Sequence, residues 1–122
     1  RERGLRAILN YGHTVGHAVE AATGISHGRA VSIGMACEAE IAVRMGLCER
    51  KLKERQDELL ELFGLPTEPP EGLDPERFSF ALSRDKKARR GRVRFVLPRA
   101  LGWVEVRDDV PSELVLEVVG LR

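Results

Sequence analysis

The segment from His27 to Met45 constrains the fold most, because its apolar residues cover nearly every face of the helix that their spacing predicts. Those residues are Val31, Ile33, Met35, Ala36, Cys37, Ala39, Ile41, Ala42 and Met45. A helix that is apolar all round belongs inside a core, so other elements must surround it. The chain has 122 residues, which is enough for one domain built around a single core.

Residues 5–22 predict a helix before this core helix, since most of their apolar side chains recur at helical spacing. Gly12 and Gly16 interrupt the pattern. A glycine inside a helix costs about 1 kcal/mol relative to alanine. We therefore expect the backbone at these two positions to approach a ligand or a neighbouring helix closely.

The remaining chain predicts smaller elements around the core helix. Asp74 followed by Pro75 is typical of a helix start, and a later alternation of apolar and polar residues is typical of a hairpin. The predicted elements are helices over 49–63, over 74–83 and from 111 onward, and hairpin strands over 92–97 and 102–106. The predicted fold class is therefore mainly α with one small β-hairpin, and residues 1–122 form one domain.

The composition argues against several classes of partner. The 20 basic and 19 acidic residues leave a net charge of +1, which gives no global field to attract nucleic acid or an acidic membrane. No apolar run approaches the roughly 20 residues that span a bilayer. Cys37 and Cys48 lack the spacing of a disulfide framework or of a zinc thiolate site. We expect a cytoplasmic protein with reduced thiols that binds neither nucleic acid nor membranes.

All three histidines of the chain lie between His13 and His27. His13 and His17 are four positions apart, so their rings share one helix face, and a tight turn can bring His27 beside them. Neutral imidazoles suit Zn²⁺, at about 2.0–2.1 Å for each Zn–N bond. Spacing alone pairs His13 with His17 on one metal. A zincin metalloprotease is not supported, because Thr14 stands where that motif needs a glutamate.

Three stretches together resemble the 3-dehydroquinate synthase family, and the likeness covers almost the whole chain. They are residues 6–20 (RAILNYGHTVGHAVE), residues 27–35 (HGRAVSIGM) and residues 85–102, which include DKK, RFVLP and LG. The resemblance implies the C-terminal helical domain of a two-domain enzyme whose N-terminal domain binds NAD⁺. Because the chain begins Arg-Glu-Arg without Met, we expect it to be part of a longer protein.

The resemblance implies an activity. Members of the family convert 3-deoxy-D-arabino-heptulosonate 7-phosphate to 3-dehydroquinate and phosphate, in the shikimate pathway of aromatic amino acid biosynthesis. The implied enzyme is a carbon–oxygen lyase that uses NAD⁺ and Zn²⁺ or Co²⁺ on a sugar-phosphate substrate. A homodimer is implied for the full-length enzyme. We expect the 122-residue chain alone to bind metal weakly and to have no turnover.

The resemblance implies a different pair of metal ligands from the pair that spacing alone suggests. It implies that His13 and His27 are ligands and that a glutamate outside the matched region is the third. One departure concerns the surroundings of the metal: Arg29 stands where the family usually has a glutamate after His27-Gly28. That change puts a supporting contact around the metal in doubt. A second departure is the loop between His17 and His27, which is shorter than in many members of the family.

For the substrate, the resemblance implies five residues. His17 contacts the phosphate side of the substrate and assists proton movement, as a group with a pKa near neutrality can. Lys87, or Lys86 in the alternative alignment, reaches the phosphate. Arg6 binds a substrate anion, and Asn10 contributes a substrate-binding amide. His17 and Lys87 are the implied catalytic residues.

Two alternatives stay open. The first is another sugar-phosphate cyclase, or a metal-dependent polyol dehydrogenase of the same architecture. Arg6, Asn10 and the two lysines favour the synthase over it. The second is a non-enzymatic helical binding module, in which the histidines and the basic run over 84–94 serve a partner or nucleic acid. We expect one lysine of that run to be functional and its other cations to be solvated at the surface.

Overall fold

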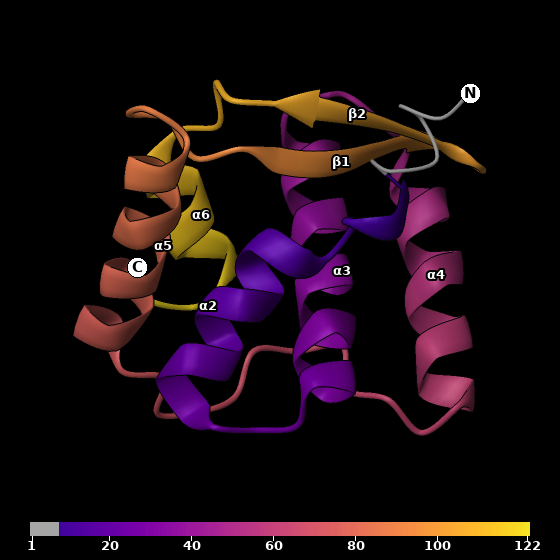
Figure 1. The fold of residues 1–122 in the computed structure, drawn as a ribbon. Helices are drawn as coiled ribbons and strands as arrows, with labels where there is room; N and C mark the ends of the chain where they lie inside the picture. The colour runs from indigo at the N-terminus through magenta and orange to yellow at the C-terminus, as the bar shows by residue number, and fades with distance from the viewer. Residues whose placement is uncertain (1–7) are drawn as a thin grey trace.

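Helix α3 (His27–Arg44) lies at the centre of the computed structural model, which describes residues 8–122 (Figure 1). Helices α2 (His13–Thr23) and α4 (Arg50–Leu62) flank it, and a hairpin of β1 (Phe95–Ala100) and β2 (Trp103–Arg107) lies across its end. Helix α5 (Pro75–Ala88) packs on α2, and the short α6 (Ser112–Val118) contacts α3. The predicted mainly helical fold with one hairpin is thereby confirmed.

The core forms where α3 meets its neighbours. Its position follows from the all-round apolar pattern of α3, because ten of the 18 residues of that helix are buried. Helices α2, α5 and α6 and strand β1 contribute buried side chains to the same cluster, whereas α4 and β2 contribute none. The cluster contains Val15, Ala18, Val19, Ala22, Ile33, Cys37, Ile41, Ala42, Leu73, Phe78, Phe95, Leu97, Val115 and Val119.

The two glycines of the first predicted helix serve close packing, but only one lies inside a helix. Gly12 precedes α2 as its N-cap with φ 86°, a left-handed conformation that favours glycine. The predicted continuous helix over 5–22 is therefore wrong at this point, because the chain turns at residues 10–12. Gly16 lies within α2, and a Cβ there would be 3.0 Å from the carbonyl oxygen of Ala30 on α3. The expected close approach of a neighbouring helix is confirmed.

The hairpin is shifted along the chain relative to its prediction. Its antiparallel register pairs Phe95 with Arg107 and Leu97 with Glu105, and an irregularity follows Pro98. The turn at residues 101–102 uses Gly102 with φ 75°, so β1 extends to Ala100 instead of ending at 97. Phe95 and Leu97 are buried, as predicted, but Val96 and Pro98 are buried as well, so the predicted alternation does not hold along β1.

Two other elements differ from their predictions in extent or burial. Helix α5 continues to Ala88 instead of ending near Ser83. The positive charges of the lysines in its last turn stabilise this extension, because the C-terminal end of a helix dipole is negative. None of the residues of α4 is fully buried. Leu59 and Phe63, which helical spacing places on one narrow apolar stripe with Leu52, Gln56 and Leu60, are exposed. In the part of the chain that the structure describes, α4 thus covers α3 only loosely.

The cysteines match their prediction. Both Cys37 and Cys48 are free thiols, the first buried and the second half-buried. Burial raises the pKa of Cys37 to about 12, so this thiol stays protonated and acts as a small apolar side chain. Among residues 8–122, the helices are all too short or too polar to cross a membrane.

Replacing Asp74 by alanine is expected to lower the free energy of unfolding by about 1 kcal/mol. The Asp74 carboxylate caps α5 by accepting hydrogen bonds from the backbone N–H of Glu76 at 2.9 Å and of Arg77 at 3.3 Å. Urea denaturation measures the change. Asp74→Asn keeps an acceptor oxygen and should lose much less; equal losses in the two variants would contradict the capping role.

Candidate metal centre

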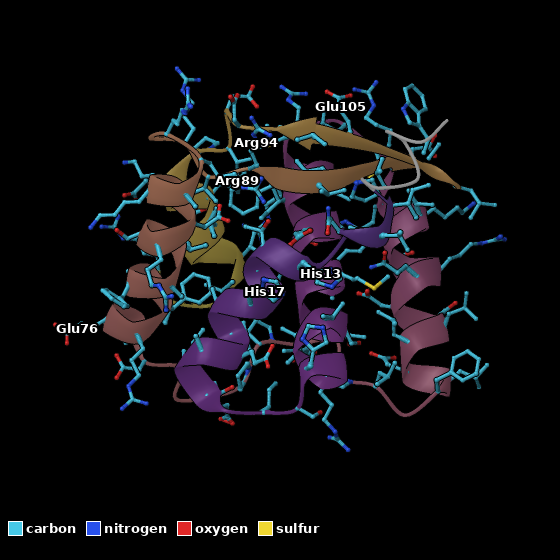
Figure 2. The ribbon with its side chains drawn as sticks, in the orientation of Figure 1. His13, His17, Glu76, Arg89, Arg94 and Glu105 are labelled. Carbon is cyan, nitrogen blue, oxygen red and sulfur yellow. The ribbon has the colours of Figure 1, made fainter. Side chains whose placement is uncertain are left out.

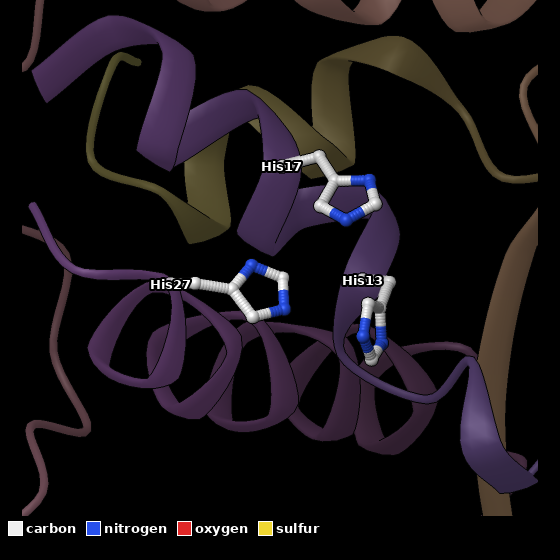
Figure 3. A group of neighbouring side chains, drawn as sticks. All are labelled: His13, His17 and His27. Carbon is white, nitrogen blue, oxygen red and sulfur yellow. The ribbon is translucent and has the colours of Figure 1, made fainter. Parts of the chain in front are cut away.

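The three histidines converge on one space. His13 and His17 project from α2 and His27 from the first residue of α3, and their rings face one another (Figure 3). The ring centroids are 5.2 Å apart for His13 and His17, 5.6 Å for His13 and His27, and 5.8 Å for His17 and His27. One nitrogen from each ring lies within 4.8 Å of the others.

Local structure explains this convergence. A spacing of four places His13 and His17 on one face of α2. The link from α2 to α3 consists of only Gly24, Ile25 and Ser26, with Gly24 at φ 75°. This short turn brings His27 back beside α2. The tight turn expected from the sequence is confirmed.

Two of the rings are oriented through Nδ1. Nδ1 of His13 lies 3.2 Å from the carbonyl oxygen of Tyr11, and Nδ1 of His27 lies 2.9 Å from Oε1 of Glu20. An acceptor at Nδ1 favours the tautomer with a proton there and leaves the Nε2 lone pair available for a metal. The arrangement is the one that metal-binding histidines usually have. Glu20 is a supporting residue that the sequence reasoning missed, although it lies one turn after His17.

The donor set suits Zn²⁺ or Co²⁺. Bonds of about 2.0–2.1 Å in a tetrahedral site place donor atoms about 3.3 Å apart. The nitrogens here, within 4.8 Å of one another, need only small ring movements to reach that spacing. The structure brings His17 as close as His27 to His13, so both predicted pairings of ligands are compatible with it.

The electrostatic surroundings distinguish His17. Partial desolvation, followed by the proximity of His13 and His27, lowers the pKa of His17 below its usual value, although the side chain is exposed. A lowered pKa keeps this imidazole neutral near pH 7 and able to accept a proton or bind a metal.

A cavity of about 480 Å³ opens beside the histidines. This histidine cavity is lined by residues of α2, of the end of α5 and of the hairpin, including three arginines. Figure 2 labels two of these arginines, Arg89 and Arg94. Arg84 and Arg94 make no ion pair with residues 8–122, while Nε of Arg89 lies 3.6 Å from Oδ1 of Asp85. The lining residues are Asn10, His13, Thr14, His17, Ala18, Ala81, Arg84, Asp85, Arg89, Arg94, Val96 and Val106.

The predicted substrate residues fall in different places. Asn10 and His17 line the histidine cavity, as expected. Lys86 lines another cavity, of about 400 Å³, beside Phe95 and α6, and Lys87 is exposed near the end of α5. Neither lysine lines the histidine cavity. Arg6 lies outside the described residues.

Arginines from the basic run, and neither of the two lysines, line the cavity beside the histidines, where a lysine was expected to reach the substrate phosphate. These arginines are exposed, as expected for the run, but a run of cations carries no mark of which ones border a cavity. Helical spacing was a signal for Arg89, which caps the end of α5 four positions after Asp85, on the same side of the helix. Arg94 is brought in by the hairpin, and its carbonyl oxygen accepts a 2.7 Å hydrogen bond from Oγ1 of Thr14.

Arg29 does not replace the missing glutamate in this site. It is exposed near the start of α3, while the carboxylate beside His27 is that of Glu20, from α2. Support for His27 therefore comes from the preceding helix.

Comparison with known proteins identifies relatives of this arrangement. The family described as "3-dehydroquinate synthase C-terminal" matches residues 1–88. The 3-dehydroquinate synthase of Nostoc punctiforme is 51% identical over 98% of the chain, and that of a Synechococcus strain is 49% identical over 98%. The chain spans 34% and 33%, respectively, of the lengths of these two proteins.

Solved structures share the fold. A 2-deoxy-scyllo-inosose synthase, complexed with carbaglucose-6-phosphate, NAD⁺ and Co²⁺, has a TM-score of 0.76 and 32% identity over 92% of this chain and 34% of its own. The 2-epi-5-epi-valiolone synthase of Streptomyces hygroscopicus, with NAD⁺ and Zn²⁺ bound, has a TM-score of 0.80 and 27% identity over 92% of this chain and 31% of its own. With the family match over residues 1–88, the chain belongs to the family of 3-dehydroquinate synthase C-terminal domains.

Proposed function

We propose that this chain is the metal- and substrate-binding part of a 3-dehydroquinate synthase. The full-length protein converts 3-deoxy-D-arabino-heptulosonate 7-phosphate to 3-dehydroquinate and phosphate, a carbon–oxygen lyase reaction of the shikimate pathway. The observation that carries the proposal is the convergence of His13, His17 and His27 beside a cavity lined by arginines. Identities near 50% to 3-dehydroquinate synthases support this reaction over those of other cyclases, whose structures are 27–32% identical.

The proposed cofactors are Zn²⁺ or Co²⁺ and NAD⁺. His13 and His27 hold the metal, with a further ligand and most NAD⁺ contacts supplied by the rest of the protein. Two solved relatives with NAD⁺ and Co²⁺ or Zn²⁺ support this choice. When bound, the metal polarises a substrate oxygen and NAD⁺ accepts and returns a hydride.

The residues of this chain bind the substrate and move protons. Guanidinium groups offer forked donors to a phosphate or carboxylate, and Arg89 and Arg94, which line the histidine cavity and are exposed, can bind such a group. Oδ2 of Asp85 is buried and has no hydrogen-bond partner among the described residues, so it can accept a hydrogen bond from a substrate hydroxyl. His17, held neutral by its lowered pKa, accepts a proton from the substrate.

The other site roles and properties stay predictions. They comprise anion binding by Arg6, an amide contact from Asn10, a phosphate contact from Lys87 or Lys86, a homodimer and a cytoplasmic location. Phosphate contact by a lysine requires the end of α5 to move or the substrate to extend beyond the histidine cavity, since neither lysine lines it.

Phosphate release by the full-length protein tests the proposed function. We expect 3-deoxy-D-arabino-heptulosonate 7-phosphate with NAD⁺ and Zn²⁺ to yield phosphate and 3-dehydroquinate, and glucose 6-phosphate to yield neither. The reverse preference would favour a different sugar-phosphate cyclase. Tight, steeply salt-dependent binding of duplex DNA without turnover would favour the binding module.

The isolated 122-residue chain is expected to release no phosphate under the same conditions. A catalytic zinc usually needs three protein ligands and an open position, and turnover also needs bound NAD⁺. Assays at equal concentrations of the chain and of the full-length protein make the comparison. Formation of 3-dehydroquinate by the chain alone would contradict this prediction.

Replacing Glu20 by alanine in the full-length protein is expected to weaken Zn²⁺ binding by about tenfold or more. The variant loses the acceptor 2.9 Å from Nδ1 of His27, which fixes the ring and its tautomer. Competition with a chromophoric chelator measures the affinity. Glu20→Gln keeps an acceptor oxygen and should be affected less; wild-type affinity in the alanine variant would exclude the role.

A further inference from the structure

Glu38 is a fully buried acidic residue on the core helix, at 0% exposure. Its Oε1 accepts a 2.9 Å hydrogen bond from the backbone N–H of Gly12, and its Oε2 accepts a 3.0 Å bond from that of Val15. No basic side chain among residues 8–122 forms an ion pair with it. Burial raises the pKa of Glu38 to about 8, against the opposing effect of the backbone N–H groups at residues 12, 14 and 15. All of the polar contacts of this side chain are thus with the start of α2.

The start of α2 lacks a cap of its own. Its N-cap residue is Gly12, which has no side chain, and no acidic residue lies in its first turn. The first N–H groups of a helix have no partner within the helix and must find one elsewhere. The carboxyl group of Glu38, reaching across from α3, supplies two of those partners. A residue 26 positions later in the chain therefore caps α2.

The capped turn is the one that carries His13. Gly12 and Val15 bracket this residue, and the Nδ1 of His13 lies 3.2 Å from the carbonyl oxygen of Tyr11 in the same turn. The Tyr11 hydroxyl in turn donates a 2.5 Å hydrogen bond to Oε1 of Gln56 on α4. The backbone position of this turn therefore sets the direction of the His13 ring.

Packing leaves the turn no alternative position on the side of α3. A Cβ at Gly34 would be 1.9 Å from the carbonyl oxygen of Gly12 and 2.7 Å from the N of Gly16, so the two backbones are in direct contact. At this distance the turn cannot move toward α3. The Glu38 bonds restrain it from moving away.

We propose that Glu38 is a positioning residue for His13, because it fixes the turn from which this imidazole reaches the metal. This inference rests on the proposed function, since it assumes a metal at the three histidines. It assigns a role in the site to a residue that does not line the histidine cavity. Glu38 touches neither metal nor substrate and acts only through the backbone of residues 12–15.

Substitution by glutamine tests the role at constant size. Glutamine has one acceptor oxygen, and its NH₂ group must face one of the two N–H donors that Glu38 now satisfies. In the full-length protein, we expect Glu38→Gln to weaken Co²⁺ binding by about tenfold, as loss of a residue that orients a ligand does. The visible absorption of bound Co²⁺ should change, and kcat should fall more than KM rises.

Glu40→Gln is the matched control. Glu40 lies on the same helix, but its carboxylate pairs with Arg44 and Arg50 at the surface. This variant should keep the wild-type Co²⁺ affinity, spectrum and turnover. A Glu38→Gln protein that is folded and matches the wild type in all three measurements would overturn the proposal.

Amide hydrogen exchange in the metal-free protein provides a readout without metal. The amides of Gly12 and Val15 should exchange faster in Glu38→Gln, while that of Gly24, bonded to the carbonyl of Glu20 at 2.8 Å, should not change. If Glu38→Gln does not fold, Glu38→Met fills similar volume without an NH₂ group and takes its place. If neither folds, rapid exchange of both amides in the wild type overturns the proposal and protection of both supports it.

Co²⁺ binding by the wild type and by Glu38→Gln distinguishes failure of the proposed function from failure of the role of Glu38. A wild-type protein that binds no Co²⁺ contradicts the proposed function, whatever the variant does. A wild type that binds Co²⁺ beside an unchanged Glu38→Gln variant contradicts the role of Glu38 alone.

Discussion

Replacing His13 by alanine in the full-length protein is expected to abolish stable metal binding and to reduce turnover by about 10³-fold. The imidazole of His13 lies close to both other rings of the cluster, at centroid distances of 5.2 Å from His17 and 5.6 Å from His27. A catalytic metal contributes several kcal/mol to the transition state, and about 4 kcal/mol corresponds to a factor of 10³. Metal content after dialysis and phosphate release measure the two effects.

His17→Ala, measured in the same way, separates the two assignments of the ligands. If His13 and His27 are the ligands, as the family resemblance implies, this variant keeps its metal and loses turnover. If His13 and His17 are the ligands, as spacing alone suggests, the His17→Ala variant loses both its metal and its turnover. Glu76→Gln, an exposed change at the far end of α5, is the control and should alter neither (Figure 2). Full metal content and near-normal turnover in His13→Ala would contradict the proposed metal site.

Replacing Gly34 by alanine is expected to destabilise the metal-free protein by about 3 kcal/mol or more. Overpacking of a core usually costs about 1–3 kcal/mol, and here the added Cβ meets backbone atoms that cannot rotate away. It would be 1.9 Å from the carbonyl oxygen of Gly12, so α2 and α3 must separate. The free energy of unfolding in urea measures the loss. Weaker metal binding should accompany it, because the turn before His13 is displaced.

Gly28→Ala is the matched control for this substitution. Gly28 lies on the same helix, its φ is not positive, and a Cβ there would meet nothing within 4 Å. The helix propensities of glycine and alanine differ by about 1 kcal/mol in favour of alanine, so this variant should be neutral or slightly more stable. Equal destabilisation by the two substitutions would show that loss of a glycine, and not contact between the helices, is responsible.

Much of the candidate site could be predicted from local sequence, because local spacing determines it. The separation of His13 and His17 by one turn is a property of any α-helix. The three-residue link before His27 leaves the chain little choice but to fold back. The hairpin and α5 were also predictable in kind, from alternation and from the Asp74-Pro75 start, though their ends were misplaced by several residues.

Long-range contacts could not be predicted in the same way. Nothing in a run of cations indicates that Arg94 lines the histidine cavity while Lys86 lines a different one, because the placement of α5 and the hairpin decides it. The apolar stripe of α4 predicts burial against the core, yet Leu59 and Phe63 of that stripe are exposed in the described part of the chain.

For this protein, the sequence by itself determined the central helix, the mainly helical fold and the cluster of three histidines, since each depends on residues within a few turns of one another. The tertiary structure alone decided how that cluster is supported. The capping of the His13 turn by Glu38 joins residues 23–26 positions apart, and the contact of Gly34 with Gly12 joins two helix surfaces. Such contacts depend on how helices pack in three dimensions, which periodicity along one chain does not specify.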